Sequence, residues 1–207
     1  SLQKKLLGAF TDEAGRIRRV RLFSWVEGRL WSGVNPIGDG LLHSLGETCG
    51  KLSKALEGFD HPKAHRAFEW DLAQAGWTLD YLHLFSGEQQ DLVAHFQKKY
   101  MQFQEGYRRL RKSVVHNDAN DHNILVSNQL IDPDVVALID FGDAIYTQLI
   151  NDVAIALAYA VMGKPDVLSA ALPLVAGYHK TFPLQEKELE FLYTLVAMRL
   201  VISVTKS

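Results

Sequence analysis

Apolar residues recur at the spacing of an amphipathic helix along most of the chain after residue 40. The pattern predicts one helix over about 41–57, ending near Gly58 and Pro62, and a second over 89–112. The apolar face of the second helix is rich in aromatic residues, which we interpret as core packing: Leu92, Val93, Phe96, Tyr100, Phe103 and Tyr107. Three further helices are predicted over 152–162, 167–182 and 186–204. Most of the chain should therefore be helical.

Strand patterns are confined to short segments. Two apolar or β-branched runs, 3–10 and 17–26, flank the turn-rich segment 11–15 and predict a β-hairpin. Two more runs, 124–126 and 135–139, are joined by a polar turn. The stretch that follows the first hairpin, as far as about residue 40, is rich in glycine, which is typical of a loop. This places a boundary between a small β-containing piece and a larger helical piece.

The charge balance excludes some partners. The 207 residues carry 22 Lys and Arg against 24 Asp and Glu, a formal net charge of −2, so no overall positive field would attract nucleic acid or an anionic membrane. The longest uncharged apolar run, 153–162, is far shorter than the ~20 residues needed to span a bilayer. Cys49 is the single cysteine, which rules out an intramolecular disulfide and suits a reducing compartment. We therefore expect a cytoplasmic protein without nucleic-acid or membrane partners.

Polar residues crowd into two segments next to the predicted strands. The first, 116–123, reads His-Asn-Asp-Ala-Asn-Asp-His-Asn, and the second, 139–143, reads Ile-Asp-Phe-Gly-Asp. Transfer of a phosphoryl group to a hydroxyl needs a carboxylate that accepts the hydroxyl proton, and oxygen ligands for Mg²⁺. Asp118, Asn123 and Asp140 are residues of these types. Their spacing matches the protein-kinase pattern of His-x-Asp, an Asn five residues after that Asp, and then Asp-Phe-Gly.

The segment 116–154 resembles the phosphotransferase enzyme family, which includes aminoglycoside phosphotransferases, choline kinase, homoserine kinase and hydroxylysine kinase. The resemblance extends over about 6–200, and the segments 69–72 and 139–144 look most like the hydroxylysine-kinase-like members. It implies an α+β fold with the C-lobe of a protein-kinase-like enzyme. That lobe would be mostly helical with a short catalytic-loop β-hairpin, and a remnant N-lobe hairpin would precede it.

Carried onto the matching positions, the resemblance assigns roles within this chain. Asp118 would be the catalytic base, and Asn123 and Asp140 would hold Mg²⁺. His116 and Asp152 would brace the catalytic loop. The remaining assignments are a hinge strand whose backbone pairs with the adenine of ATP, at Ser24, Trp25 and Val26, and a guessed acceptor pocket at Asp121, His122 and Asp143. The implied function is ATP-dependent transfer of the γ-phosphate to a hydroxyl of a small, amine-bearing metabolite, such as a hydroxy-amino acid, an amino alcohol or an aminoglycoside.

Parts of a complete kinase have no counterpart in this sequence. A Gly-rich phosphate loop, a strand Lys for the phosphates and its Glu partner are all missing. Gly28 and Gly33 have P-loop spacing, but Val and Asn follow where Lys and Ser or Thr are required. We therefore expect a fragment that is nearly inactive alone, with 1–28 as partial N-lobe strands and hinge and 29–207 as the helical C-lobe. Fusion to further domains in the full-length protein would agree with this expectation.

Two other functions remain open at this point. His116, Asp118 and His122 could offer imidazole and carboxylate ligands to a transition metal, as in a metal-dependent hydrolase, although this leaves Asn123 and Asp140 unexplained. The chain could also be a non-catalytic kinase-like module that binds a partner or ligand within a larger polypeptide, since no phosphate-binding Lys is found in it. Binding of Mg·ATP by the full-length protein would separate this second alternative from an enzyme.

Overall fold

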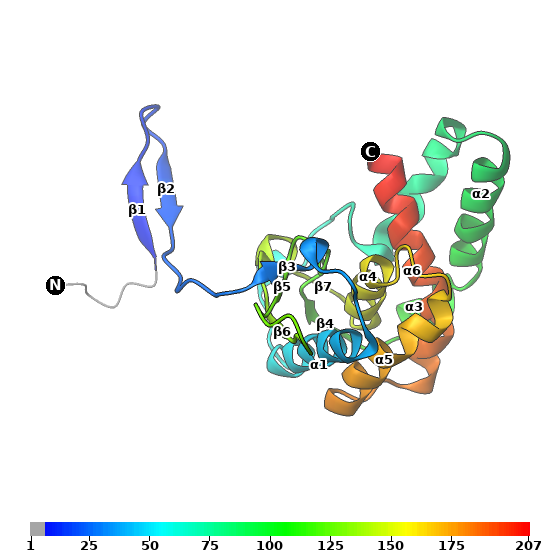
Figure 1. Cartoon of the computed structure of the whole chain (residues 1–207). Helices are drawn as coiled ribbons and strands as arrows, with labels where there is room; N and C mark the ends of the chain where they lie inside the picture. The colour runs from blue at the N-terminus through cyan, green and yellow to red at the C-terminus, as the bar shows by residue number, and fades with distance from the viewer. Residues whose placement is uncertain (1–6) are drawn as a thin grey trace.

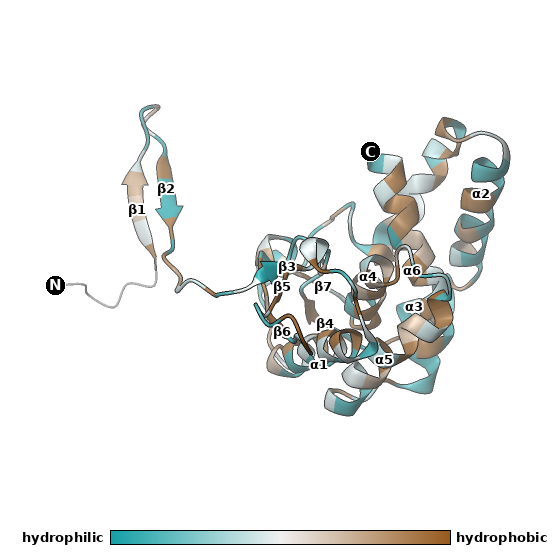
Figure 2. Cartoon of the chain, in the orientation of Figure 1, coloured by the Kyte–Doolittle hydropathy of each residue, from teal (hydrophilic) through white to brown (hydrophobic). Residues whose placement is uncertain are grey.

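The structure of the chain is a computed structural model that describes residues 7–207. Its helical body is built around α4 (Ile150–Ala160), which is buried along almost its whole length, as expected for a helix that is apolar on nearly all sides. Around α4 lie α1 (Asp39–Ala55), α5 (Val167–Thr181) and α6 (Glu186–Lys206) (Figure 1). The peripheral helix α2 (Gly87–Gln102) alternates instead between hydrophobic and hydrophilic bands (Figure 2). No helix in this described part is long and apolar enough to cross a membrane.

The helices α1 and α5 approach closely because each carries a glycine where they cross. A Cβ built on Gly46 of α1 would lie 2.0 Å from the backbone oxygen of Leu174. A Cβ built on Gly177 of α5 would lie 2.2 Å from the backbone oxygen of His43. Real Cβ atoms do not approach backbone oxygens this closely, so no other residue fits in either place without a shift of the helices. The two glycines therefore fix how α5 packs against α1.

Two small antiparallel sheets lie against the helices. Their strands are β3 (Arg29–Leu30), β4 (Lys112–Val115), β5 (Ile124–Val126), β6 (Val135–Leu138) and β7 (Ile145–Gln148). One sheet has the order β3–β5–β6, and the other pairs β4 with β7.

The strand pairing brings the two polar segments of the sequence together. The segment 116–123 connects β4 to β5, and the segment 139–144 connects β6 to β7. Because β5 pairs with β6 and β4 with β7, both segments cross from one sheet to the other at the same place. A hydrogen bond from the backbone N–H of Ile139 to the backbone oxygen of Asn123 (2.9 Å) joins them directly. The fold therefore places the two motifs side by side.

An N-terminal arm, defined here as residues 7–28, stands away from the helical body (Figure 1). Its hairpin pairs β1 (Gly8–Thr11) with β2 (Ile17–Val20), and all residues of both strands are exposed. The turn is held by Asp12, whose carboxylate accepts hydrogen bonds from two backbone N–H groups. β2 is followed by a segment without regular secondary structure, 21–28. The arm is thus held together mainly by contacts within its own hairpin.

The predicted fold class, mostly helical with small sheets, is confirmed. The sequence predicts α1, α4, α5, α6 and the pair of β5 and β6, and each is observed within a few residues of its expected bounds; the predicted N-terminal hairpin is also observed, with different strand bounds. Residues 3–6 of the expected first strand lie outside the described residues. The expected strand over 17–26 is too long, because β2 ends at Val20 and the chain then leaves the hairpin.

The single helix predicted over 89–112 is wrong. α2 ends at Gln102, the short helix α3 (Gln104–Arg108) follows, and β4 begins at Lys112. Leu92, predicted on the apolar face, is 59% exposed. The sequence reading also missed β4 and β7, because their strand character depends on pairing with each other across a long stretch of sequence. The body further contains turns of 3-10 helix at Trp31–Gly33, Pro62–Ala64, Leu72–Leu84 and Phe141–Asp143.

Candidate active site

A buried carboxylate in the first turn of α4 anchors the segment 116–123, which we call the catalytic loop. Asp152 Oδ2 accepts a hydrogen bond from the backbone N–H of His116 (2.9 Å), and its Oδ1 accepts one from the N–H of Asn117 (2.7 Å). Burial raises the pKa of the Asp152 carboxyl, while the two N–H groups act in the opposite direction. Asn117 adopts a left-handed backbone conformation with φ 66°, which turns the chain sharply at this point. The start of the loop is thus fixed by α4.

His116 connects the catalytic loop to the neighbouring segment 139–144. Its ring is fully buried, and Nδ1 accepts a hydrogen bond from the backbone N–H of Asp118 (3.2 Å). The other nitrogen, Nε2, therefore carries the hydrogen and donates to the backbone oxygen of Ile139 (3.0 Å). The ring edge also packs on Phe141, with centroids 4.6 Å apart. Both ring nitrogens are occupied within the protein, which fits a bracing role.

The positions of His116 and His122 do not support the alternative function of a metal-dependent hydrolase. A metal ligand needs a nitrogen lone pair, and Nδ1 of His116 already accepts a hydrogen bond. His122, the second proposed imidazole ligand, is exposed and its Nδ1 lies 3.0 Å from Oδ1 of the adjacent Asp121. Among residues 7–207, no group of three or more His, Cys, Asp and Glu side chains is arranged to hold a metal ion.

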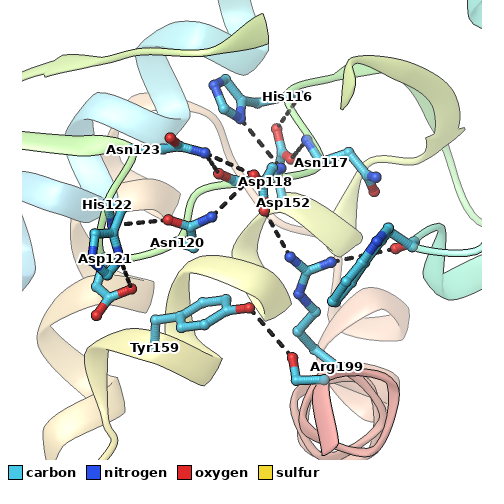
Figure 3. A network of polar contacts seen from close by, with 12 residues as sticks. His116, Asn117, Asp118, Asn120, Asp121, His122, Asn123, Asp152, Tyr159 and Arg199 are labelled. Atoms are coloured by element: carbon cyan, nitrogen blue, oxygen red, sulfur yellow. Dashed lines mark hydrogen bonds and ion pairs between the residues drawn. The ribbon is translucent and has the colours of Figure 1, made fainter. Parts of the chain in front are cut away.

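Asp118 and Asn123 are in direct contact at the centre of the loop (Figure 3). The side-chain amide of Asn123 donates to Asp118 Oδ2 (2.7 Å) and to the backbone oxygen of Asp118 (2.9 Å). The amide of Asn120 donates to the same Oδ2 atom (3.0 Å). The loop backbone closes on itself as well, since Asn123 N donates to the backbone oxygen of Asn120 (3.0 Å). The five-residue spacing of Asp118 and Asn123 thus corresponds to one compact turn.

Arg199 of α6 is a member of this site that the sequence reading did not include. Its Nη2 lies 2.7 Å from Asp118 Oδ1, and its side chain is 2% exposed, against 18% for that of Asp118. The available signal was a lone arginine in the otherwise apolar run 195–202 of a predicted helix. Such a residue must find a partner when it is buried. Its position 81 residues after Asp118 gave no indication of which partner that is.

The second motif lies on the turn between β6 and β7. Asp140 has a left-handed backbone conformation with φ 62°, and its Oδ1 accepts a hydrogen bond from the N–H of Gly142 (3.1 Å). Asp143 follows at the end of the same turn. Burial raises the pKa of Asp143, and the negative charges of Asp118 and Asp140 raise it further. Electrostatically, the three carboxylates therefore belong to one site.

The donor set of this site fits a divalent cation. Oδ1 of Asn123 and Oδ2 of Asp140 accept no hydrogen bond from any of the residues 7–207. Amide and carboxylate oxygens are the ligand types of Mg²⁺, which otherwise keeps waters and phosphate oxygens. Burial is the main cause of the raised pKa of Asp143, and the negative charges of Asp118 and Asp140 add to it; a bound cation would oppose this second contribution. Asn123 and Asp140 are thus the residues that would hold the ion.

Other predicted site residues lie apart from this centre. Asp121 and His122 occupy the outer side of the catalytic loop, and neither side chain hydrogen-bonds to Asp118 (Figure 3). The predicted hinge residues belong to the segment 21–28 of the arm and are exposed, with Trp25 at 83%. Within the described part of the chain, nothing brings the hinge residues to the carboxylates. The structure thus groups His116, Asp118, Asn123, Asp140, Asp143 and Asp152 and leaves Ser24, Trp25, Val26, Asp121 and His122 outside that group.

Fold and site together define the C-lobe of a kinase-like phosphotransferase: a helical body with a His-x-Asp loop, its Asn, and Asp-Phe-Gly on the adjoining turn. The profile of the phosphotransferase enzyme family matches residues 5–190, and the chain belongs to this family. The resemblance seen in the sequence is therefore confirmed.

Individual relatives agree with this assignment. The chain is 31% identical over 194 residues to hydroxylysine kinase of Bos taurus, covering 87% of this chain and 50% of the relative. It is 29% identical over 196 residues to the Danio rerio hydroxylysine kinase, covering 89% and 54%. The chain thus spans about half the length of the curated relatives that it matches.

Solved structures show the same fold at low identity. A microcompartment-associated aminopropanol kinase superimposes with a TM-score of 0.70 at 20% identity, covering 96% of this chain and 62% of that one. An amicoumacin kinase in complex with AMP-PNP and Ca²⁺ gives a TM-score of 0.67 at 18% identity, covering 98% and 61%. These likenesses establish the kinase-like fold of the chain.

Proposed function

We propose that the protein transfers the γ-phosphate of ATP to a hydroxyl of a small, amine-bearing metabolite. The observation that carries the proposal is the contact of Asp118 with Asn123 on a loop that is hydrogen-bonded to the segment of Asp140. These residues have the spacing and side-chain chemistry of a phosphoryl-transfer site. Membership of the phosphotransferase family and the hydroxylysine kinase relatives support the same reaction class.

In the proposed reaction, Asp118 is the general base. The acceptor hydroxyl hydrogen-bonds to the Asp118 carboxylate, which takes its proton as the hydroxyl oxygen bonds to the γ-phosphorus. The bond between the γ-phosphorus and the bridging oxygen breaks, its electron pair stays on the β-phosphate, and ADP leaves. The proton on Asp118 is then released to solvent. Asn123 and Asp140 would hold Mg²⁺, which supplies positive charge against the phosphate oxygens when it is bound.

The acceptor is the finer part of the proposal. Asp118, Asp140 and Asp143 interact electrostatically, because the first two carboxylates add to the effect of burial in raising the pKa of Asp143, and a group of carboxylates favours a substrate that carries an ammonium group. Relatives named hydroxylysine kinase and a neighbour named aminopropanol kinase act on hydroxylated amines. Asp143 is the best placed of the guessed acceptor residues, since Asp121 and His122 lie on the outer side of the loop.

Nucleotide binding is proposed to involve the arm as well. Residues 1–28 would form partial N-lobe strands and a hinge, at Ser24 to Val26, and residues 29–207 would form the C-lobe. A Gly-rich phosphate loop and its Lys are absent from the sequence, so we expect residues 1–207 alone to transfer phosphate poorly. A cytoplasmic location is part of the proposal, because ATP is abundant there and the single cysteine, Cys49, is free and buried.

The decisive experiment is a phosphorylation screen with the full-length protein. Hydroxy-amino acids, amino alcohols and aminoglycosides are offered with Mg·ATP, and ADP release and phosphorylated product are measured. Asp118→Asn should lower kcat by roughly 10² to 10⁴ and leave the ATP dissociation constant nearly unchanged. Asp91→Asn, an exposed aspartate on α2, is the matched control and should retain wild-type turnover. Wild-type turnover in Asp118→Asn would contradict the assigned base, and ATP binding without transfer to any acceptor would favour a non-catalytic module.

A further inference from the structure

A buried arginine from the last helix faces the carboxylate of Asp118. The side chain of Arg199 is 2% exposed, and its Nη2 donates to Asp118 Oδ1 at 2.7 Å. Removing a guanidinium from water is costly unless a charged partner compensates. Asp118 is the partner, so the charge of Arg199 is balanced at the catalytic loop rather than elsewhere on α6. Helix α6 is thereby tied to the proposed base.

The guanidinium of Arg199 also contacts two aromatic rings. Its carbon lies 4.6 Å from the ring centroid of Trp70 and 5.6 Å from that of Tyr159. Tyr159 belongs to α4, and Trp70 lies in the loop before Leu72–Leu84. Cation–π contacts of a desolvated arginine with two rings restrict its rotamers. The position of Nη2 is therefore defined by three separate parts of the fold.

The two oxygens of the Asp118 carboxylate differ in their remaining capacity. Oδ2 already accepts two hydrogen bonds, from the side-chain amides of Asn120 (3.0 Å) and Asn123 (2.7 Å). Oδ1 accepts one, from Arg199. A carboxylate oxygen offers about two acceptor positions, so Oδ2 is filled and Oδ1 keeps one position free. The side chain of Asp118 is 18% exposed, and because Oδ2 has no acceptor position left, an incoming hydroxyl would bind at Oδ1.

We propose that Arg199 is a positioning residue that orients Asp118, so that Oδ1 is the oxygen that accepts the proton of the acceptor hydroxyl. This inference rests on the proposed function. It adds that Oδ1 of Asp118 is the atom that acts as base, and that Arg199 holds this atom in position. Oδ1 receives the proton from the hydroxyl while the hydroxyl oxygen bonds to the γ-phosphorus. The guanidinium stays protonated throughout, and its hydrogen bond prevents rotation of the carboxylate away from the acceptor.

The test compares three arginine variants in the full-length protein. Arg199→Met removes the charge, Arg199→Lys keeps it with a single donor group, and Arg111→Met is the matched control. Arg111 also holds α6, through Nη2 to Glu188 Oε2 (2.7 Å) and Nε to Glu188 Oε1 (2.9 Å), and its partner is fully buried. Loss of Arg111 thus loosens the same helix without touching Asp118. Steady-state kcat, both KM values and Tm are measured for each.

Arg199→Met should lower kcat by about 10- to 100-fold, by analogy with the loss seen when a residue that orients a metal ligand is removed. The KM values for ATP and acceptor should change little, because neither substrate loses a direct contact. Arg199→Lys should recover part of the lost kcat. Arg111→Met should lower Tm but keep kcat near the wild-type value. Equal kcat values for Arg199→Met and Arg111→Met, or a loss seen only in KM, would overturn the proposal.

A second measurement remains valid if Arg199→Met does not fold. Arg199→Lys is introduced into wild-type and Asp118→Asn proteins, and kcat is compared. If Arg199 acts through Asp118, the lysine variant lowers kcat in the wild type and has no further effect in Asp118→Asn. Additive losses in the two backgrounds would overturn the inference while the proposed function stands. A wild-type protein that binds Mg·ATP but phosphorylates no acceptor would instead overturn the proposed function, and the positioning role with it.

Discussion

The catalytic loop, 116–123, and the N-terminal arm, 7–28, both resemble functional parts of a kinase, yet they are built in opposite ways. In the loop, buried side chains from α4 and α6 reach the backbone and the carboxylate, through Asp152 and Arg199. In the arm, the strands are exposed on all sides and the polar contacts stay within the hairpin. The conformation of the catalytic loop is fixed by contacts with the body. The conformation of the arm is fixed only by hydrogen bonds within its own hairpin.

This difference separates two parts of the proposed chemistry. The position of the base follows from packing within the helical body, so it should persist whatever the arm does. A hinge contact with adenine has no such support, because Trp25 and its neighbours are exposed and do not pack on the body. Substitutions that disturb the anchors of the catalytic loop should therefore change stability and turnover together, while substitutions in the arm should change nucleotide binding alone.

The largest effect on stability is expected when a side chain replaces a glycine at the contact between α1 and α5. In Gly46→Ala the new methyl group would lie 2.0 Å from the backbone oxygen of Leu174, so the helices must move apart. Overpacking of this kind costs about 1–3 kcal/mol, and a contact with rigid backbone should reach the upper end or exceed it. Urea unfolding monitored by circular dichroism measures the loss.

The same helix provides a matched control for this substitution. Gly40 also belongs to α1, but a Cβ there meets nothing within 4 Å. Gly40→Ala should leave stability unchanged or raise it by up to about 1 kcal/mol, because alanine is the better helix former. Equal stability of the two variants would show that the close approach of α1 and α5 does not limit the packing of the body.

An intermediate effect is expected at the anchor of the catalytic loop. Asp152→Asn replaces one acceptor oxygen by an NH2 group, so the N–H of His116 or Asn117 faces a donor. An unsatisfied buried group costs about 1–3 kcal/mol, and the displaced loop should lower kcat as well. Asp166→Asn is the control, since this exposed cap of α5 also accepts a backbone N–H, and asparagine caps about equally well. Matching losses in the two variants would contradict an anchoring role of Asp152.

The smallest effect on stability is expected in the arm. Val26→Pro removes a backbone N–H from the proposed hinge, and the free energy of unfolding should change by less than about 0.5 kcal/mol, as for other exposed positions. The ATP dissociation constant of the full-length protein should rise about 5-fold, corresponding to one hydrogen bond of about 1 kcal/mol. Isothermal titration calorimetry measures this change. Val26→Ala keeps the N–H and should bind ATP normally, whereas unchanged binding in both variants would remove this N–H from the nucleotide site.

The parts of the site that could be predicted are those whose residues lie close together in the sequence. Asp118 and Asn123 lie on one turn, and Asp140 lies on the linker between β6 and β7, so their spacing in the sequence, compared with the kinase pattern, indicated their association. The helices of the body were predictable for a similar reason, since a buried face repeats every three or four residues. Local sequence patterns were therefore sufficient to predict the fold class and the grouping of Asp118, Asn123 and Asp140.

The parts that failed depend on distant pairing. β4 takes its strand character from β7, and the helix predicted over 89–112 breaks because the chain must turn to reach that partner. Arg199 belongs to the site only because α6 passes beside the catalytic loop. Long-range contacts of this kind leave no local periodicity, so a sequence reading sees only a lone charge on an apolar helix.

The pairing of Asp118 with Arg199 also affects the order of events during synthesis. The ribosome completes the whole catalytic loop long before it reaches α6, so a nascent chain carries Asp118, the proposed base, without its counter-charge. Only when α6 has left the exit tunnel can the guanidinium contact Trp70 and Tyr159. Formation of the ion pair between Asp118 and Arg199 is thereby coupled to the synthesis and docking of α6.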